Sequence, residues 1–432
     1  MTSIALPKAP ANFSARTAAA TAVGTTMEMY DFVLYGTASS LVFNKLFFPS
    51  QDPVIGTLAA LATFGVGFLA RPLGGVMFGH LGDRVGRKTV LIVTMLAMGL
   101  LSTVIGVLPT YQSIGMGAPA LLVLFRLLQG VAMGGEQGGA FVMAAETGAR
   151  KRGFLASWPA VGMVGGLVLA TLIFGIFSRL PEQQFMAWGW RVPFLLSLVL
   201  VGVGLAVRLG VPETQAFEQI QEKSEIVKAP LVDAVRGYWK QILQVVGMKA
   251  GETAAFFFLA TFSITYGVQF LKLNRTLVLN AVLAGAIAEM VVVPLWGLLS
   301  DRIGRRPVLM FGAGFLIVFA APFFMLLNTK QPAMIYLSLI LAMAVGHGAI
   351  SSPAGAFFAE IFPTRVRLSG VSLSIQVTAA LAGGFTPLIA TALMASYHSY
   401  VPISIYIAVL AGISLTSAVL TVETYKLRTL PE

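Results

Sequence analysis

Stretches of about twenty apolar residues with almost no charge recur along this chain of 432 residues. Examples are residues 90–108, 194–207 and 334–350. Each stretch, with its flanks, is long enough to cross the hydrocarbon core of a bilayer as a helix. Charged residues make up 11% of the sequence and hydrophobic residues 57%, whereas roughly 25% of the residues of a soluble domain are charged. The sequence therefore predicts an all-α protein embedded in a membrane.

Turns and clusters of charge divide the apolar sequence into twelve predicted spans. They lie near residues 19–44, 55–79, 89–109, 120–145, 154–177, 191–211, 241–266, 277–299, 307–327, 333–356, 369–394 and 399–421. An even number of spans places both termini on one side of the membrane. The first span contains Glu28 and Asp31, which a cleaved signal peptide would not carry in its apolar region. We therefore expect the first span to be retained.

Lys and Arg are concentrated at the termini and in the even-numbered connections. The densest clusters cover residues 84–88, 150–152, 302–306 and 365–367. Because cytoplasmic loops carry an excess of Lys and Arg, both termini are predicted to be cytoplasmic. The net charge of +11 thus indicates orientation in a bilayer, and no nucleic acid partner is expected.

One loop sequence occurs twice, at a shift of 218 residues: GHLGDRVGRKTVL at 79–91 and GLLSDRIGRRPVL at 297–309. A second echo relates Ala145-Glu146 to Ala359-Glu360 at nearly the same shift. Two echoes at one shift predict the duplication of a six-helix unit. We expect an N-terminal bundle at 1–211, a polar cytoplasmic linker at 212–240 that could contain interfacial helices, and a C-terminal bundle at 241–432.

The duplicated loop places an Asp near the C-terminus of a helix, followed by Arg and by a Gly that permits a tight turn. A carboxylate there requires a partner, either a neighbouring Arg or the N-terminus of an adjacent helix. Such contacts could hold one conformation and be released in another, or they could form a rigid turn that fixes helix spacing. The predicted gating residues are Gly79, Asp83, Arg84, Gly86, Arg87, Asp301, Arg302, Gly304 and Arg305.

These motifs resemble those of the major facilitator superfamily. The duplicated loop resembles its signature loop, and Arg126-Leu-Leu-Gln129-Gly130 with Gly134 resembles its second motif. Further segments, at 30–32, 134–139, 188–193 and 359–367, are similar to its metabolite:proton symporter family, which includes carriers of shikimate, 2-oxoglutarate, citrate and proline or betaine.

The resemblance implies two pseudo-symmetric six-helix bundles, alternating access and no cofactor. Residues 56–84 and 182–193 look closest to the shikimate-type carriers, which implies a small organic acid as substrate. Met29 and Gln137 depart from that pattern, since those carriers have aromatic residues at both positions.

Charged residues inside the predicted spans are candidate functional groups, because each costs about 2.5–3.5 kcal/mol on insertion scales unless it is paired or hydrated. Glu28 and Asp31 are three residues apart and share a helix face. Two carboxylates on one partly desolvated face favour proton uptake by one of them. The predicted proton-coupling residues are Asp31, Glu136, Arg126 and Glu28. Arg126 either modulates the proton site or receives an anionic group of the substrate.

The predicted substrate-binding residues are Arg126, Tyr30, Tyr35, Lys249, Glu252, Glu289 and Gln376. Lys249 and Glu252 could instead form a structural ion pair at i, i+3. A tyrosine in a membrane helix also commonly joins helices without touching a substrate.

Enzymatic function is not expected. Cysteine is absent, which excludes disulfides, thiolate catalysis and Cys-bound metals. His80, His347 and His398 are too scattered to predict a metal site. The glycine patterns at 65–70 and 82–89 lack the strand context or the spacing that nucleotide binding requires.

We therefore expect a monomeric, proton-coupled carrier of a small organic acid in the cell inner membrane, operating as an importer. The alternative is proton-driven efflux of a small anionic drug or antibiotic. Gly153, Gly162 and Gly166 follow the spacing that opens the fifth-helix motif of superfamily antiporters, although Leu167 replaces the Pro of that motif.

Overall fold

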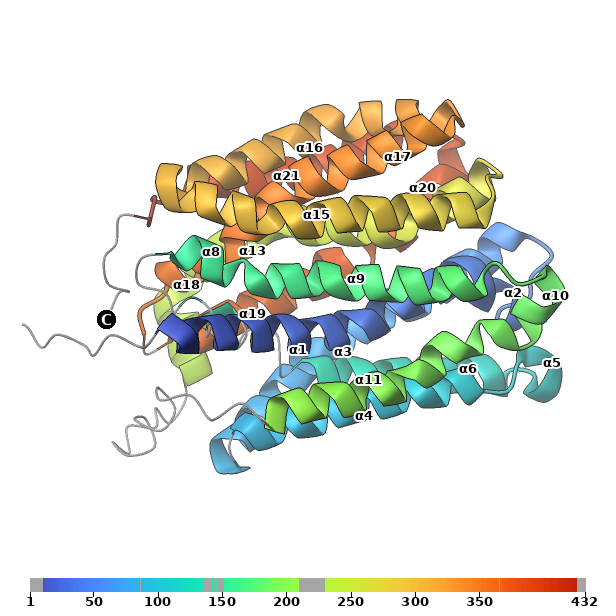
Figure 1. Ribbon diagram of the computed structural model, residues 1–432, viewed down its shortest axis with the longest axis horizontal. Helices are drawn as coiled ribbons and strands as arrows, with labels where there is room; N and C mark the ends of the chain where they lie inside the picture. Colours follow the sequence, from blue (N-terminus) through green and yellow to red (C-terminus); the bar gives the residue numbers. More distant parts are fainter. Residues whose placement is uncertain are drawn as a thin grey trace, which may run out of the picture.

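The computed structural model describes residues 11–85, 87–134, 141–142, 145, 151–209, 230–364 and 366–425. Long helices run side by side along one axis of the molecule (Figure 1). The start of α1 and the end of α21 lie at the same end of the bundle, which we call the termini end. The opposite end is called the far end.

The first half of the chain supplies the following helices. They are α1 (Ala11–Ala38), η1 (Ser39–Phe43), α2 (Asn44–Leu46), α3 (Pro53–Val85), α4 (Arg87–Val107), α5 (Tyr111–Ile114), α6 (Gly117–Met133), α8 (Arg152–Ala156), α9 (Trp158–Phe177), α10 (Glu182–Gln184), η2 (Phe185–Gly189) and α11 (Arg191–Leu209). The η segments are π-helical turns, which are frequent at functional positions of helices.

The second half supplies a matching series. It comprises α13 (Pro230–Phe257), η3 (Phe258–Phe262), α14 (Ser263–Thr265), η4 (Tyr266–Phe270), α15 (Arg275–Ile303), α16 (Arg305–Asn328), α17 (Pro332–Ile340), η5 (Leu341–His347), α18 (Gly348–Ile361), α19 (Arg367–Thr378), η6 (Ala379–Gly383), α20 (Thr386–Tyr397) and α21 (Val401–Val419).

These helical segments follow the twelve predicted spans in order. Eight helices of the described residues are long and apolar enough to cross a membrane, and α11 adds a span that is bent by 40° from the short helix before it. Shorter apolar helices cover 92–107 and 117–133. The remaining span is α1, which carries Glu28 and Asp31.

The seventh span begins inside the predicted linker. Its helix starts at Pro230, and the non-helical backbone of Tyr238 (φ −132°, ψ 26°) marks a kink before the buried part. Residues 210–229 lie outside the described residues, so the division of the chain at 211 and 240 stays a prediction.

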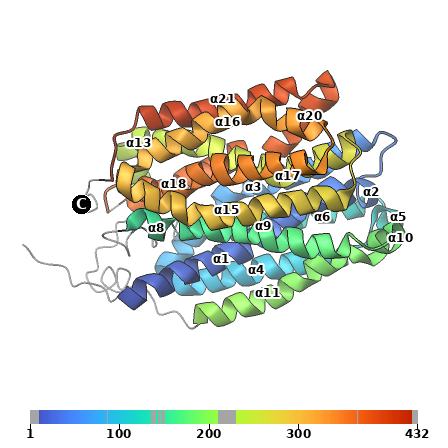
Figure 2. The same cartoon turned by 45° about the horizontal axis from the view of Figure 1, so that its top comes forward.

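Glycines allow close contact between α1 and α9. A Cβ atom at Gly162 would lie 2.2 Å from the carbonyl oxygen of Ala22. A Cβ at Gly166 would lie 2.5 Å from Cβ of Met29. The two helices therefore pack backbone to backbone, and Figure 2 shows them alongside each other in a second orientation.

The two halves meet along two seams. In one, α9 lies against α15 (Figure 1), and in the other α3 packs against α19 and α20. Hydrogen bonds between residues of the two halves, described below, also connect them.

Candidate functional site

Arg126 on α6 is fully buried in the first half, inside a cage of aromatic rings. Its guanidinium carbon lies 4.0 Å from the ring centroid of Phe32, 4.3 Å from that of Tyr35 and 5.0 Å from that of Phe64. Aromatic faces stabilise a desolvated cation by up to about 2 kcal/mol. Of its nitrogens, Nη1 donates to Oε1 of Gln129 over 3.2 Å, whereas Nε and Nη2 have no hydrogen-bond partner among the described residues. Two nitrogens of this buried cation therefore have no acceptor among the described residues.

Space for this guanidinium depends on Gly67 of α3. A Cβ atom at this position would lie 2.6 Å from Nε of Arg126. A Cβ at Gly130 would lie 2.0 Å from the carbonyl oxygen of Gly67, so α3 and α6 also approach closely here. The glycine pattern at 65–70 is accounted for by helix packing.

Asp31 on α1 is connected to Arg126 by a chain of hydrogen bonds. Nε2 of Gln129 donates to Oγ of Ser102 over 2.7 Å, and Ser102 in turn hydrogen-bonds the Asp31 carboxylate. A second hydroxyl, that of Ser197, donates to Oδ1 of Asp31 over 2.7 Å. Because the links polarise one another, the charge state of Asp31 affects the electrostatic balance of Arg126.

A small polar cavity adjoins Asp31. It is lined by Asp31, Glu28 and Ser197 together with apolar side chains, and its volume is about 10 Å³. That volume corresponds to about one water molecule. Glu28 lines the same cavity and interacts electrostatically with Arg71 on α3.

Arg71 and Gln376 connect the halves in the middle of the bundle. Nε of Arg71 donates to Oε1 of Gln376 over 2.9 Å, and Nε2 of Gln376 donates to the carbonyl oxygen of Gly134 over 3.0 Å. Both side chains are buried. The predicted site residue Gln376 is therefore a contact between halves in this conformation.

A second charged cluster is buried in the C-terminal half. Nζ of Lys249 lies 2.6 Å from Oε2 of Glu252, and the Thr253 hydroxyl donates to the same oxygen over 2.9 Å. Nδ1 of His347 is hydrogen-bonded to Oε1 of Glu289. Nε2 of His347 lies 3.9 Å from Oε1 of Glu252, which links the two pairs. The predicted residues Lys249, Glu252 and Glu289 thus belong to one network.

The termini end is closed by a contact that we call the termini latch. The Asp301 carboxylate at the end of α15 accepts the backbone N–H groups of Gly153, over 2.8 Å, and Phe154, over 3.0 Å, from the opposite half. Nη1 of Arg305 donates to Oδ1 of Asp301 over 2.6 Å. The predicted carboxylate therefore has both kinds of partner, an Arg and a helix N-terminus.

Further charges support this latch. Glu360 on α18 lies 3.8 Å from Nη1 of Arg152 and 3.5 Å from Nη2 of Arg305. Gly304 has a φ of +114°, a conformation that favours glycine, and ends α15. Arg302 is exposed and makes none of these contacts.

The far end is closed by a separate set of contacts, the far latch. Arg275 of the C-terminal half forms an ion pair with Glu182, and it donates to the carbonyl oxygens of Ser178 and Leu180. Ser40 accepts a hydrogen bond from Thr265 over 2.9 Å.

Glu182 lies in the connection before α11, outside the spanning helices. Lys45 binds its other oxygen over 3.0 Å. Partial burial raises the pKa of the Glu182 carboxyl, but the hydrogen bonds and positive charges of Lys45 and Arg275 outweigh that effect. They hold the pKa of Glu182 below its ordinary value.

Not every predicted site residue can be placed. The side chains of Glu136, Gly79, Asp83, Arg84, Gly86 and Arg87 lie outside those that the structure describes. Tyr30 is buried and donates its hydroxyl to the carbonyl oxygen of Pro193 over 2.7 Å, so it joins α1 to α11. The Tyr35 hydroxyl shares a hydrogen bond with Thr63. Neither hydroxyl is left without a partner.

Sequence reasoning missed several members of the site. Ser102 and Ser197 bind Asp31, but serine is common in membrane helices and these two carry no motif. In the sequence His347 is an isolated histidine. The signal that identifies it is its position as an ionisable residue inside a span.

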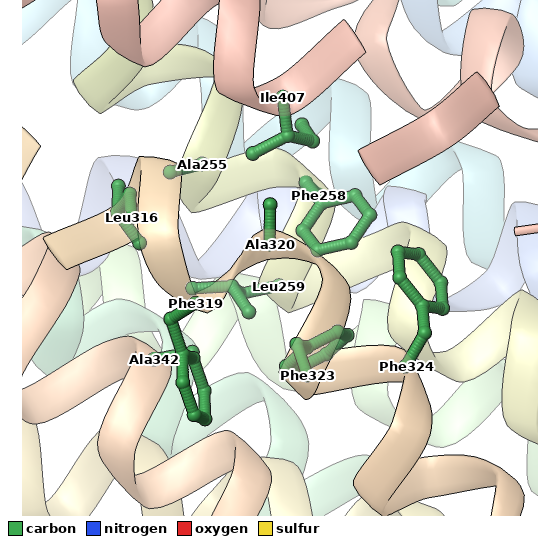
Figure 3. Close-up of a pocket in the computed structure, with 10 residues that line it drawn as sticks. All are labelled: Ala255, Phe258, Leu259, Leu316, Phe319, Ala320, Phe323, Phe324, Ala342 and Ile407. Atoms are coloured by element: carbon green, nitrogen blue, oxygen red, sulfur yellow. The ribbon is translucent and has the colours of Figure 1, made fainter. Parts of the chain in front are cut away.

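A second cavity, of about 20 Å³, lies within the C-terminal half (Figure 3). Its lining is apolar and includes Phe258, Phe319, Phe323 and Phe324, whose rings surround the gap. Small apolar cavities of this kind stay dry. It offers no polar group to an organic acid, and we regard it as a packing gap.

Comparison with known proteins identifies the family. Residues 21–387 match the model of the Major Facilitator Superfamily. The chain is 39% identical over 413 residues to the shikimate transporter of Escherichia coli K12, covering 94% of both chains. It is 38% identical over 422 residues to an inner membrane metabolite transport protein of the same strain, covering 96% of both.

A solved structure shows the same fold. The D-xylose-proton symporter superposes with a TM-score of 0.72 at 17% identity, covering 96% of this chain and 99% of that one. The predicted fold class, two six-helix halves of an all-α membrane protein, is confirmed. So is the prediction that the chain is a transporter and not an enzyme. The chain belongs to the major facilitator superfamily, among its metabolite permeases.

Proposed function

We propose that this transporter imports a small organic acid together with protons. The observation that carries the proposal is the state of Arg126: a caged guanidinium with two nitrogens, Nε and Nη2, that no described residue satisfies. A carboxylate of the substrate would satisfy both, because the guanidinium fork matches carboxylate geometry. The relatives include a shikimate transporter, and shikimate carries a carboxylate of this kind.

Asp31 supplies the proton coupling. When Asp31 is ionised, it balances the positive charge of Arg126 through Ser102 and Gln129. Protonation of Asp31 removes that balance and frees Arg126 to bind the substrate carboxylate. Binding of the proton and of the anion therefore favour each other, which is the requirement for symport.

Alternating access is attributed to the two latches. The termini latch at Asp301 and the far latch at Arg275 connect the halves at opposite ends. Opening one while the other stays closed exposes the central residues to one side only. The positive-inside rule assigns the termini end to the cytoplasm of the inner membrane.

The test is uptake into oriented proteoliposomes with an imposed pH gradient. Radiolabelled shikimate, succinate and glycine betaine are offered separately. We expect accumulation of an organic acid driven by an inward proton gradient. Extrusion of the label would favour the efflux alternative, and the absence of gradient-driven movement for every acid would overturn the proposal.

The variant Asp31→Asn should lose net accumulation and retain exchange of labelled for unlabelled substrate. Without the carboxylate, Arg126 has no balancing anion once the substrate leaves, so the return step is blocked. Asp52→Asn in the far-end connection is the matched control, since Asp52 is exposed and caps only the local backbone at Val54. Normal accumulation by Asp31→Asn would remove Asp31 from the mechanism.

A further inference from the structure

The cluster of Lys249, Glu252, Glu289 and His347 is not used by the mechanism above. The four side chains come from α13, α15 and η5, and each is at least nine-tenths buried. Charged and ionisable groups at this depth in a membrane protein are costly and are typically functional. The arrangement of the imidazole between two carboxylates indicates what the cluster can do.

His347 directs one ring nitrogen toward each carboxylate. Nδ1 is hydrogen-bonded to Glu289, and since an ionised carboxylate can only accept, Nδ1 carries the proton of that bond. In the neutral imidazole, Nε2 then carries a lone pair and no proton. This nitrogen lies 3.9 Å from Oε1 of Glu252 and has no hydrogen-bond partner among the described residues. A lone pair facing a carboxylate is repulsive. One added proton at Nε2 converts the contact into an attraction.

Charge balance favours the same proton. With a neutral imidazole the cluster holds one positive charge, on Lys249, and two negative charges, on Glu252 and Glu289. With an imidazolium it is neutral. These three residues are the charged groups that act on His347, and they come from the two helices α13 and α15. An unbalanced charge in the membrane interior is unfavourable, so the cluster favours the binding of one additional proton.

The cluster lies next to the contact between the halves. Nζ of Lys249 is 5.7 Å from the ring of Phe141, which belongs to the N-terminal half. The His347 ring packs against Phe256, and the adjacent Phe257 contacts the rings of Phe64 and Phe68 across the seam. Separation of the halves would therefore bring solvent to the cluster.

We propose that His347, held between Glu289 and Glu252, is a second proton-binding site of the transport cycle. A proton enters at Nε2 when the central residues are open to the far end, and it leaves to the opposite side when the termini latch opens. Each cycle then carries two protons, one on each half of the molecule. This inference rests on the proposed function of a proton-coupled carrier.

Proton stoichiometry tests it. At zero membrane potential, set with potassium and valinomycin, a gradient of one pH unit supports roughly tenfold accumulation per cotransported proton. We expect wild-type protein in proteoliposomes to accumulate radiolabelled shikimate about 100-fold per pH unit, the product of two such factors. If wild-type protein accumulates shikimate only about tenfold, the second site is ruled out. If no offered acid accumulates at all, the proposed function fails instead.

A double variant isolates the second site. His347→Gln with Glu289→Gln leaves Lys249 and Glu252 as a neutral ion pair, and it avoids the buried negative charge that His347→Gln alone would create. We expect transport that accumulates shikimate about tenfold per pH unit. The control is His398→Asn at an exposed far-end position, which should keep the wild-type value. A double variant with the wild-type stoichiometry would show that the cluster is only structural.

A spectroscopic measurement covers the case in which the double variant is inactive. Protein labelled with ¹⁵N-histidine and carrying substitutions at His80 and His398 reports on His347 alone. We expect Nε2 to change from the unprotonated to the protonated form within the working pH range of transport, while Nδ1 stays protonated. An imidazole that stays neutral, or stays doubly protonated, throughout that range would overturn the proposal.

Discussion

Arg71 on α3 and Gln376 on α19 are joined by a 2.9 Å hydrogen bond across the boundary between the two halves. Gln376 also donates to the backbone of Gly134 on the side of Arg71, so its amide is held at both ends by the N-terminal half. The guanidinium is additionally packed 5.3 Å from the ring centroid of Phe68. This bridge must break whenever the halves separate along their middle.

Gln376→Leu should increase opening between the halves. A hydrogen bond to a charged group contributes about 1.5–3 kcal/mol, equivalent to roughly 10- to 150-fold in an equilibrium constant. Because the chain has no cysteine, Thr261→Cys at the buried contact with Gly36 serves as a reporter. We expect it to react faster with a permeant maleimide when combined with Gln376→Leu. The exposed Gln331→Leu is the control, and equal rates in both would contradict the bridge.

Gly67→Ala should weaken substrate binding without unfolding the protein. The new methyl group would lie 2.6 Å from Nε of Arg126 and displace the guanidinium from its aromatic cage. Loss of cation–π contacts worth about 1–2 kcal/mol predicts an increase in KM of roughly tenfold. Gly314→Ala is the matched control, since no atom lies within 4 Å of its added Cβ. Initial uptake rates at varied substrate concentration give KM, and an unchanged KM would show that the cage does not position Arg126.

Asp301→Asn should loosen the termini latch. The substitution removes the charge that pairs with Arg305 and weakens the acceptors for the Gly153 and Phe154 amides. Because charge-assisted bonds contribute about 1.5–3 kcal/mol, exchange of these two amides with deuterium should accelerate by roughly 10- to 150-fold. Asp52→Asn should accelerate exchange only at Val54, whose amide it caps. Protected amides at Gly153 and Phe154 in Asp301→Asn would disprove the latch.

The far latch should not titrate between pH 5 and 8. The pKa of Glu182 is held below its ordinary value by Lys45 and Arg275, and glutamate ordinarily titrates near pH 4.3. A lowered pKa means that the pair is intact throughout that range and is lost only as the pH falls through the lowered value. Glu182→Gln should therefore change the uptake rate by a constant factor and leave the shape of the pH profile unaltered. A profile that shifts between pH 5 and 8 in this variant would contradict the assignment.

The fold could be predicted because its determinants are local in the sequence. Apolar stretches of fixed length define spans, and the loop repeated at 79–91 and 297–309 defines two halves. The sequence does not show that the helix of the seventh span extends back to Pro230, because residues 230–240 are polar enough to resemble a linker with interfacial helices. The π-helical turns, such as η5 ending at His347, depend on packing between helices and leave no pattern in the sequence.

The candidate site could be predicted only in part. Asp31, Arg126, Lys249, Glu252 and Glu289 are costly in a membrane wherever they occur, so each is conspicuous alone. Which of them meet is decided by tertiary packing, as when Glu289 on α15 contacts His347 on η5. Ser102 and Ser197 are conspicuous only once Asp31 is placed between them.

The close packing of α1 on α9 couples the positions of these two helices. The span that starts at Arg152 has its first amides gripped by Asp301 at the termini end, and its glycines hold the backbone of α1 near Ala22 and Met29. We expect the two helices to move together, because a Cβ atom at Gly162 or Gly166 would already clash with α1. We therefore expect release of Asp301 to move Asp31 as well, because the proposed proton site lies on the helix that packs against the span held by the termini latch. This coupling between Asp301 and Asp31 would be present even for a substrate that contacts neither residue.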